Sequence, residues 1–251
     1  MPLTKALNYN IIQYPLQETF LGEGTAMAKI GIVLSGSGVY DGSEIHESVL
    51  TLYFLDKFGA TTVMMAPNVD QAHVVNHLTG EVSQGERRNV LVEAARIARG
   101  NIKDIKNVRA ADIHALIFPG GYGAAKNLSS FAFDGVHCKV NEDVANLARE
   151  AYRLGKPIGA ICIAPAMRAR IFGEAIPLEL TIGTDKETAN AINTMGSRHI
   201  NCAAANIVVD SKHKVISTPA YMLAGSIKEA AEGIEKLVKA ILDMVELRND
   251  G

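Results

Sequence analysis

Tryptophan is absent from the 251-residue chain, which has only 3 cysteines and 8 prolines. Three cysteines (Cys138, Cys162 and Cys202) are too few and too scattered for a disulfide framework, which favours a reducing compartment. No uncharged stretch of the chain approaches the length of a membrane span; the stretch from Pro157 to Met167, for example, is bounded by Lys156 and Arg168. A membrane-spanning helix needs about 20 apolar residues. We therefore expect no membrane partner.

The chain also lacks an excess of positive or negative charge, because its formal net charge is only −2. A nearly balanced chain offers no electrostatic attraction to a phosphate backbone, so we expect no nucleic acid partner. The first 28 residues contain no arginine and no basic segment followed by an apolar one. Secretory signals and organellar transit peptides have those features, and their absence predicts a cytoplasmic location.

Short apolar runs alternate with segments of helical periodicity from Lys29 onward. The pattern predicts strands at 29–34, 61–66, 115–118, 157–161, 207–209 and 215–217. It predicts helices at 43–57, 89–99, 141–154, 163–172, 185–195 and 226–247. Strands separated by helices form parallel βαβ units. The predicted fold is therefore α/β, with a doubly wound, mostly parallel sheet flanked by helices, as in flavodoxin-like proteins.

No linker or repeat divides the chain. We expect an N-terminal extension over residues 1–28, a single α/β domain over 29–247 and a C-terminal tail over 248–251. Doubly wound sheets bind their ligands at the carboxyl ends of the strands. The loops that begin at Ser35, Gly120 and Cys162 are therefore the places to look for a site.

Cys162 lies where a predicted strand turns into a predicted helix, with Ala160 two residues before it and Ala164 two residues after it. A nucleophile elbow needs small neighbours of this kind because its turn is tight. The N-terminus of the following helix would lower the pKa of the thiol. The alternative is a buried structural cysteine, the usual environment of this residue.

Two glycine-containing loops accompany this turn. Residues 118–123, Phe-Pro-Gly-Gly-Tyr-Gly, could direct backbone N–H groups at an oxyanion, or could be only a tight turn. Residues 35–47 begin Ser-Gly-Ser-Gly, but Asp41 stands where a dinucleotide-binding fingerprint requires its third glycine, and Gly42 comes one residue late, so we expect no such cofactor. Glu44 and Glu47, one helical turn apart, could face the strand ends beside Cys162 or be ordinary acidic residues of a first helical turn.

Together these segments resemble the ElbB family. That family is a branch of the class I glutamine amidotransferase-like superfamily, which also includes PfpI-type proteases and deglycase-type proteins. The resemblance covers residues 29–247 and rests on residues 35–47, 76–81 (Asn-His-Leu-Thr-Gly-Glu), 119–128, 162–167 (Cys-Ile-Ala-Pro-Ala-Met) and 218–223 (Thr-Pro-Ala-Tyr-Met-Leu).

The resemblance implies a role for individual residues. Cys162 matches the nucleophile of the superfamily, and Glu47 matches the acid that hydrogen-bonds to it, with Glu44 as the reserve candidate. The backbone N–H groups of Gly121 and Ile163 match the oxyanion hole. His199 matches the site histidine; Gly120 and Lys126 are expected to help bind substrate, with packing or surface solvation as the alternative for Lys126.

The resemblance also implies an activity. ElbB members are similar to glyoxalases that convert small dicarbonyls such as glyoxal and methylglyoxal to hydroxy acids without a cofactor or a metal, and superfamily relatives form homodimers. The glutaminase members carry a His-x-Glu pair, whereas Asn201 follows His199 here. Two alternatives therefore stay open: a catalytically weak redox-sensing or protein-interaction member, and a glutaminase that depends on a partner protein.

Overall fold

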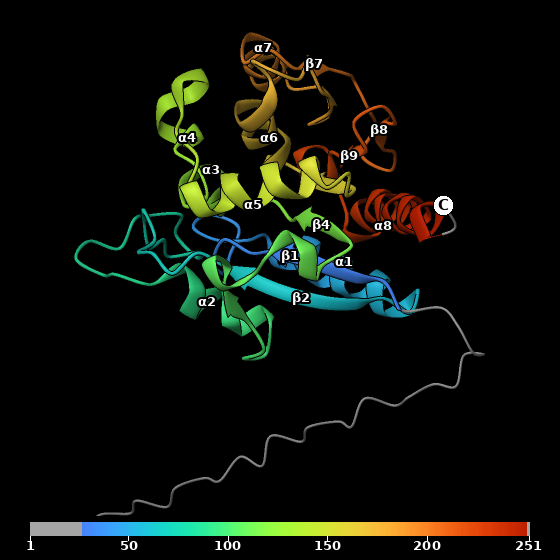
Figure 1. Ribbon diagram of the computed structural model, residues 1–251. Helices are drawn as coiled ribbons and strands as arrows, with labels where there is room; N and C mark the ends of the chain where they lie inside the picture. The colour runs from blue at the N-terminus through green and yellow to red at the C-terminus, as the bar shows by residue number, and fades with distance from the viewer. Residues whose placement is uncertain (1–26, 250–251) are drawn as a thin grey trace, which may run out of the picture.

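Seven strands of the chain form one central sheet in the computed structural model, which describes residues 27–249. The strand order is β3-β2-β1-β4-β5-β9-β8, and every neighbouring pair is parallel except β8 and β9. The strands are β1 (Lys29–Val33), β2 (Thr61–Ala66), β3 (Lys103–Asp104), β4 (Ala115–Phe118), β5 (Ile158–Ile161), β8 (Val208–Asp210) and β9 (Val215–Thr218). β1, β2 and β4 lie side by side at the centre of the molecule (Figure 1). The predicted α/β fold class is confirmed.

Both faces of the sheet are buried, which explains why its central strands are almost wholly apolar. Val33, Leu116 and Phe118 point into one hydrophobic cluster, whereas Ile32 and Ile117 point into the other. Successive side chains of a strand face opposite sides of the sheet, so a strand with helices on both sides must be apolar throughout.

Helices cover the two faces. The first cluster contains side chains of α5 (Glu142–Arg153) and α6 (Ala164–Phe172). The second contains side chains of α1 (Ile45–Lys57), α2 (Val90–Ile97) and α8 (Ile227–Asn249). α1 and α8 pack against each other. The layering places the start of α1 and the start of α6 at the carboxyl edge of the sheet.

Side-chain capping sets where several helices begin. Asn89, Asn141 and Asp185 each accept a hydrogen bond from a backbone N–H in the first turn of α2, α5 and α7 (Lys186–Thr194). A side-chain oxygen at this position satisfies one of the N–H groups that a helix start leaves free. These three starts lie within one residue of the sequence prediction.

Several short elements carried too little pattern for sequence analysis to find. They are β3, the two-stranded sheet of β6 (Glu179–Leu180) and β7 (Arg198–His199), and the helices α3 (Tyr122–Lys126) and α4 (Phe131–Asp134). Each has 5 residues or fewer, which is too short for a helical or strand periodicity to be recognised. The expected extension (1–28) and tail (248–251) lie largely outside the described residues, and the single domain stays a prediction.

No helix between residues 27 and 249 has the length and apolar character needed to cross a membrane.

Candidate active site

Cys162 lies directly after β5 and before α6, at the carboxyl edge of the sheet. Its φ is +62°, in a region that non-glycine residues rarely adopt. Ala160 before it and Ala164 after it are fully buried, so the turn has no room for larger side chains. A hydrogen bond from the Cys162 N–H to the Thr218 carbonyl, 3.0 Å long, fastens the turn to β9. The predicted sharp strand-to-helix turn is therefore present.

The sulfur of Cys162 has backbone donors around it. The N–H groups of Gly121 and Ile163, the two residues expected to form an oxyanion hole, lie within hydrogen-bonding reach of this sulfur. They come from different loops, one after β4 and one at the start of α6. An oxygen bonded to a carbon on the sulfur would develop its negative charge close to these donors.

Glu47, the second residue of this site, is fully buried in the first turn of α1. One carboxylate oxygen accepts a hydrogen bond from the Gly120 N–H at 3.0 Å, and the other accepts one from the Tyr221 N–H at 3.1 Å. The carboxyl group also hydrogen-bonds with the thiol of Cys162. Glu47 is thus held by one loop after β4 and another after β9.

Burial dominates the ionisation of Glu47. Loss of hydration, together with the nearby charge of Glu44, raises the pKa of Glu47 to about 8, although the two backbone donors act in the opposite direction. The carboxyl group is therefore mostly protonated at neutral pH and can donate a hydrogen bond to the sulfur.

The expectation of a lowered thiol pKa at Cys162 is wrong. Burial raises the pKa of this thiol well above its usual value, and the charge of Glu47 raises it further, whereas the Gly121 and Ile163 N–H groups only partly oppose the change. The thiol is 8% exposed, so it loses most of its hydration. The resting cysteine is a neutral thiol beside a neutral carboxyl group.

Glycine is required at positions 120 and 121. A Cβ on Gly120 would overlap the Cβ of Cys162 and lie 2.7 Å from a carboxylate oxygen of Glu47. Gly121 has a φ of +91°, and a Cβ there would overlap the backbone of Glu44. The close approach of this loop to the cysteine therefore explains its paired glycines. The Gly120 N–H, expected to help bind substrate, is occupied by Glu47.

The sequence predicted that Glu44 lies within the helix at 43–57. In the structure it is instead the N-cap residue of α1. Its backbone is extended, and its carboxylate accepts the Glu47 N–H at 2.7 Å. Its own N–H donates to the Gly120 carbonyl at 3.0 Å. The helix consequently begins at Ile45 rather than Ser43. Glu44 is therefore an ordinary acidic residue at a helix start, the alternative that sequence analysis left open, whereas Glu47 contacts Cys162.

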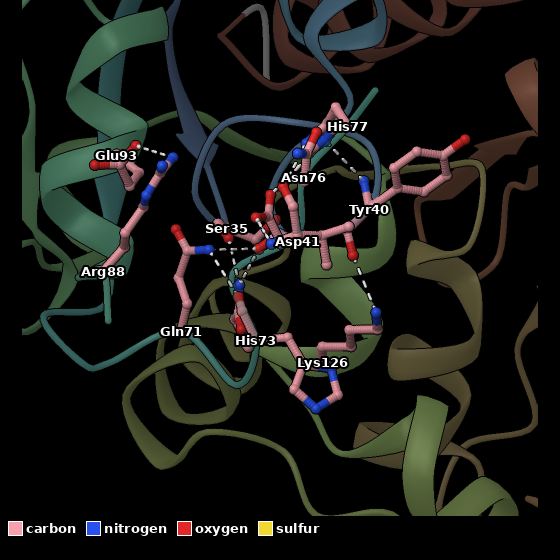
Figure 2. A network of polar contacts seen from close by, with 12 residues as sticks. Ser35, Tyr40, Asp41, Gln71, His73, Asn76, His77, Arg88, Glu93 and Lys126 are labelled. Carbon is pink, nitrogen blue, oxygen red and sulfur yellow. Dashed lines mark hydrogen bonds and ion pairs between the residues drawn. The ribbon is translucent and has the colours of Figure 1, made fainter. Parts of the chain in front are cut away.

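His199 and Lys126 do not join this cluster through any interaction among residues 27–249. His199 lies in β7, where its Nε2 faces the Ile182 N–H at 3.3 Å. Lys126 donates to the Tyr40 carbonyl at 3.0 Å, within a loop network that Figure 2 shows around Asp41. Lys126 also lines a groove of about 910 Å³ that does not include Cys162.

Tyr221 and His46 lie beside Glu47, and sequence analysis did not single them out. Tyr221 donates its backbone N–H to Glu47, and its hydroxyl lies 2.9 Å from Nδ1 of His46. Both residues lie inside segments that carry the family resemblance, His46 directly before Glu47 and Tyr221 just after the last strand of the parallel part of the sheet. Their position at the carboxyl edge of the sheet, in a helix start and in a turn after a strand, was the available signal. Within residues 27–249, no three His, Cys, Asp or Glu side chains are grouped so that they could hold a metal ion.

Comparison with known proteins extends over most of the chain. It is 45% identical over 226 residues to human glutamine amidotransferase-like class 1 domain-containing protein 3, mitochondrial, covering 86% of this chain and 83% of the relative. It is 43% identical to the rat ES1 protein homolog, mitochondrial, over 86% and 84% of the two chains. No protein-family model matches.

A solved structure agrees with the sequence comparison. The isoprenoid biosynthesis protein with an amidotransferase-like domain from Ehrlichia chaffeensis is 37% identical, with a TM-score of 0.80 over 86% of this chain and 99% of that one. The relatives also correct one expectation. Both the human and the rat protein are named as mitochondrial, so the prediction of a cytoplasmic location, based on the composition of the first 28 residues, is wrong.

Proposed function

Because the chain belongs to the family of class I glutamine amidotransferase-like proteins that includes these human and rat relatives, we propose that it is an ElbB-type enzyme acting on small dicarbonyls. The reaction would convert glyoxal or methylglyoxal to a hydroxy acid without a cofactor. The observation that carries this proposal is the arrangement of Cys162, with backbone N–H groups and a protonated Glu47 around one sulfur.

The first chemical step uses this arrangement directly. The Cys162 sulfur adds to the aldehyde carbon, an S–C bond forms, and the thiol proton ends on the former aldehyde oxygen. While that oxygen is negative, the N–H groups of Gly121 and Ile163 can donate to it. A neutral Glu47 donates to the sulfur as it gains charge, whereas an ionised Glu47 would repel it. The raised pKa of Glu47 thus suits a nucleophile that ionises only during reaction.

The two alternatives have less support. A redox sensor needs an accessible cysteine with a low pKa, but Cys162 is buried and its pKa is raised. A glutaminase of this superfamily uses a histidine oriented by a carboxylate. Here Asn201 replaces that carboxylate, and the imidazole of His199 faces Ile182.

Hydroxy-acid formation from glyoxal and methylglyoxal by the purified chain tests the proposal. Cys162→Ser should abolish turnover, because a serine hydroxyl with no adjacent base is a far weaker nucleophile. Cys202→Ser is the matched control, since that cysteine is partly exposed and lies outside the site; it should keep full activity. Turnover that survives Cys162→Ser, or wild-type protein with no turnover, would refute the proposal.

We also propose that this protein is mitochondrial, as its human and rat relatives are named. The full chain with a C-terminal fluorescent tag, expressed in human cells, should co-localise with mitochondria. A diffuse cytosolic signal would contradict this location without affecting the proposed chemistry.

A further inference from the structure

His46 and Tyr221 form a polar pair beside Glu47, which accepts the Tyr221 N–H and directly follows His46. Nδ1 of His46 and the hydroxyl of Tyr221 are 2.9 Å apart, and the two ring centroids are 5.7 Å apart. The residues are 175 positions apart in the chain and come from the first turn of α1 and the 3₁₀ turn Ala220–Met222. Both elements begin at the carboxyl edge of the sheet.

The same two elements build the environment of Glu47. Tyr221 donates its backbone N–H to one Glu47 oxygen, and His46 is the residue before Glu47. Ala220 has a φ of +41°, a strained value for a residue with a side chain. Strain of this kind persists only where the surrounding contacts enforce it, and it is concentrated at functional sites. Here it occurs at the residue that precedes Tyr221, and a second positive φ occurs at Cys162.

The ring of His46 also has an unused nitrogen. Nδ1 is engaged by Tyr221, while Nε2 has no hydrogen-bond partner among residues 27–249. The side chain is exposed, so a small molecule can reach it. The imidazole of His199, the other histidine considered for this site, is directed at the Ile182 N–H instead.

The proposed reaction needs a group of this kind. After addition to Cys162, the substrate must lose a proton from the carbon bonded to sulfur and gain one on the adjacent carbon. Glu47 is less suited to carry this proton, because both of its oxygens are already held by backbone N–H groups. A positioned imidazole accelerates such transfers by about 10²–10⁴-fold.

We infer that His46 and Tyr221 are the proton-transfer pair of this site: His46 moves the proton between the two substrate carbons, and Tyr221 orients the imidazole and hydrogen-bonds to the second carbonyl oxygen. This inference rests on the proposed dicarbonyl activity and adds residues to it.

The step balances within the substrate. His46 takes the proton from the carbon attached to sulfur, and the electron pair of that C–H bond forms a C=C bond while the second carbonyl oxygen gains a proton. The Tyr221 hydroxyl supplies the proton that this oxygen gains. The proton held by His46 then adds to the second carbon, while the hydroxyl group on the first carbon gives its proton back to Tyr221, which leaves a thioester at the first carbon. The first carbon is thus oxidised and the second reduced, so no external oxidant is needed. Water then cleaves the S–C bond, releasing the hydroxy acid and the Cys162 thiol.

The test measures hydroxy-acid formation from methylglyoxal with hydrogen or deuterium on the aldehyde carbon. His46→Gln should lower kcat by about a hundredfold, leave KM little changed and increase the deuterium isotope effect on kcat, because proton removal becomes slower than every other step. Tyr221→Phe keeps the backbone N–H that holds Glu47 and should lower kcat less. The rate of Cys162 alkylation by iodoacetamide should be unchanged in both variants.

His137→Gln is the matched control, since His137 is exposed in the 3₁₀ turn Gly135–His137, away from the sheet edge. A His46→Gln enzyme as active as this control would overturn the inference while leaving the proposed function standing. Equal losses of turnover and of Cys162 alkylation in His46→Gln would also overturn it, because they would show a structural role. Wild-type protein without turnover would instead refute the dicarbonyl activity and, with it, the role of the pair.

Discussion

Burial and hydrogen bonding act in opposite directions on Glu47, and burial prevails. Two backbone N–H donors favour the carboxylate, yet the pKa is raised from 4.5 to about 8. A folded-state pKa above that of the unfolded chain means that the folded state retains a proton which the unfolded chain has released. From pH 4.5 to pH 8, Glu47 therefore makes the fold progressively less stable as pH rises.

Glu47→Gln removes the pH dependence of stability that Glu47 causes, so a comparison of the variant with wild type measures that dependence. At about 1.4 kcal/mol per pKa unit, the variant should gain up to about 5 kcal/mol of stability over wild type between pH 4.5 and pH 8. Urea unfolding of both proteins at several pH values would measure the difference. A difference that does not grow with pH would show that Glu47 ionises normally in the folded protein.

Arg168 is another buried titratable side chain, and none of its three nitrogens has a hydrogen-bond partner among the described residues. Its guanidinium carbon lies 4.7 Å from the ring centroid of Phe118 and 5.0 Å from that of Phe172. Burial lowers the pKa of Arg168 to about 9, so the folded state disfavours the charged form. Stacking on two aromatic rings offsets only part of this cost.

Arg168→Met should therefore stabilise the protein, because an apolar side chain of similar length fills the same space without a charge. Replacement of buried charges by apolar groups yields about 1–4 kcal/mol in favourable cases. Thermal unfolding at pH 7 would measure the change, with Arg168→Lys as the control that keeps a positive charge and gains nothing. A lower melting temperature for Arg168→Met would show that the stacked guanidinium stabilises the fold.

Sequence reasoning predicted the contact between Cys162 and Glu47 but not the direction in which their pKa values shift. Cys162 and Glu47 could be found because each lies at the end of a predicted element within a matching motif. The direction of the thiol pKa was predicted wrongly, because it depends on hydration lost to neighbours that only the folded structure brings together. The Tyr221 N–H was missed because a backbone donor leaves no residue signature.

Loops rather than helices or strands form most of the site, and hydrogen bonds between these loops fix their positions. Asn127 is central to one such set of contacts. Its side-chain amide donates to the carbonyls of Ser35 and Asp41 at 2.8 Å each, and its oxygen accepts the Ala72 N–H at 2.9 Å. The Asp41 carboxylate accepts the Val75 N–H at 2.7 Å (Figure 2). The loop that leads into α1 is thereby tied to residues 70–75.

Asn127→Ala should loosen this connection. The variant removes the Asn127 donor from the carbonyl of the buried Ser35, which costs about 1–3 kcal/mol of stability, whereas the Asp41 carbonyl keeps a hydrogen bond from Gln71. Amide hydrogen exchange should become faster in residues 35–43 and 70–75, and Cys162 alkylation should change little. Asn190→Ala, at an exposed position of α7, is the control and should leave exchange in both segments unchanged. Unaltered exchange in the Asn127 variant would show that other contacts hold these loops.

The elements that sequence analysis predicted best are those with a strong local pattern. The strand at 115–118 and the helix at 141–154 agree with β4 and α5 to within a residue. The start of α1 was misplaced because Glu44 is a rarer cap than Asn or Ser, and its carboxylate accepts the Glu47 N–H through a longer side chain.

At the level of the whole molecule, the alternation of strands and helices predicted the parallel sheet but not the order of its strands. The order depends on contacts between residues far apart in the chain, such as the parallel pairing of β5 with β9, in which Ile158 faces Val215. The antiparallel pairing of the edge strand β8 with β9 follows from the short connection between the strands that sequence analysis predicted at 207–209 and 215–217.

The homodimer implied by the family resemblance remains a prediction at this scale. α1 leaves apolar side chains exposed at helical spacing, with Ile45 44%, Val49 50% and Tyr53 55% accessible. An exposed apolar stripe of this kind is a candidate contact surface. Sedimentation velocity should show a dimer for wild type and a monomer for Val49→Glu. A monomeric wild-type protein would contradict the prediction.

The central claim, that Cys162 is the nucleophile for a dicarbonyl, is tested most directly by the covalent intermediate. Wild-type protein mixed with methylglyoxal, quenched rapidly in acid and digested, should carry one substrate mass on the peptide that contains Cys162. His46→Gln should accumulate more of this adduct, because it forms normally and decays slowly. An adduct confined to Cys202, or to lysine and arginine side chains, would contradict the account.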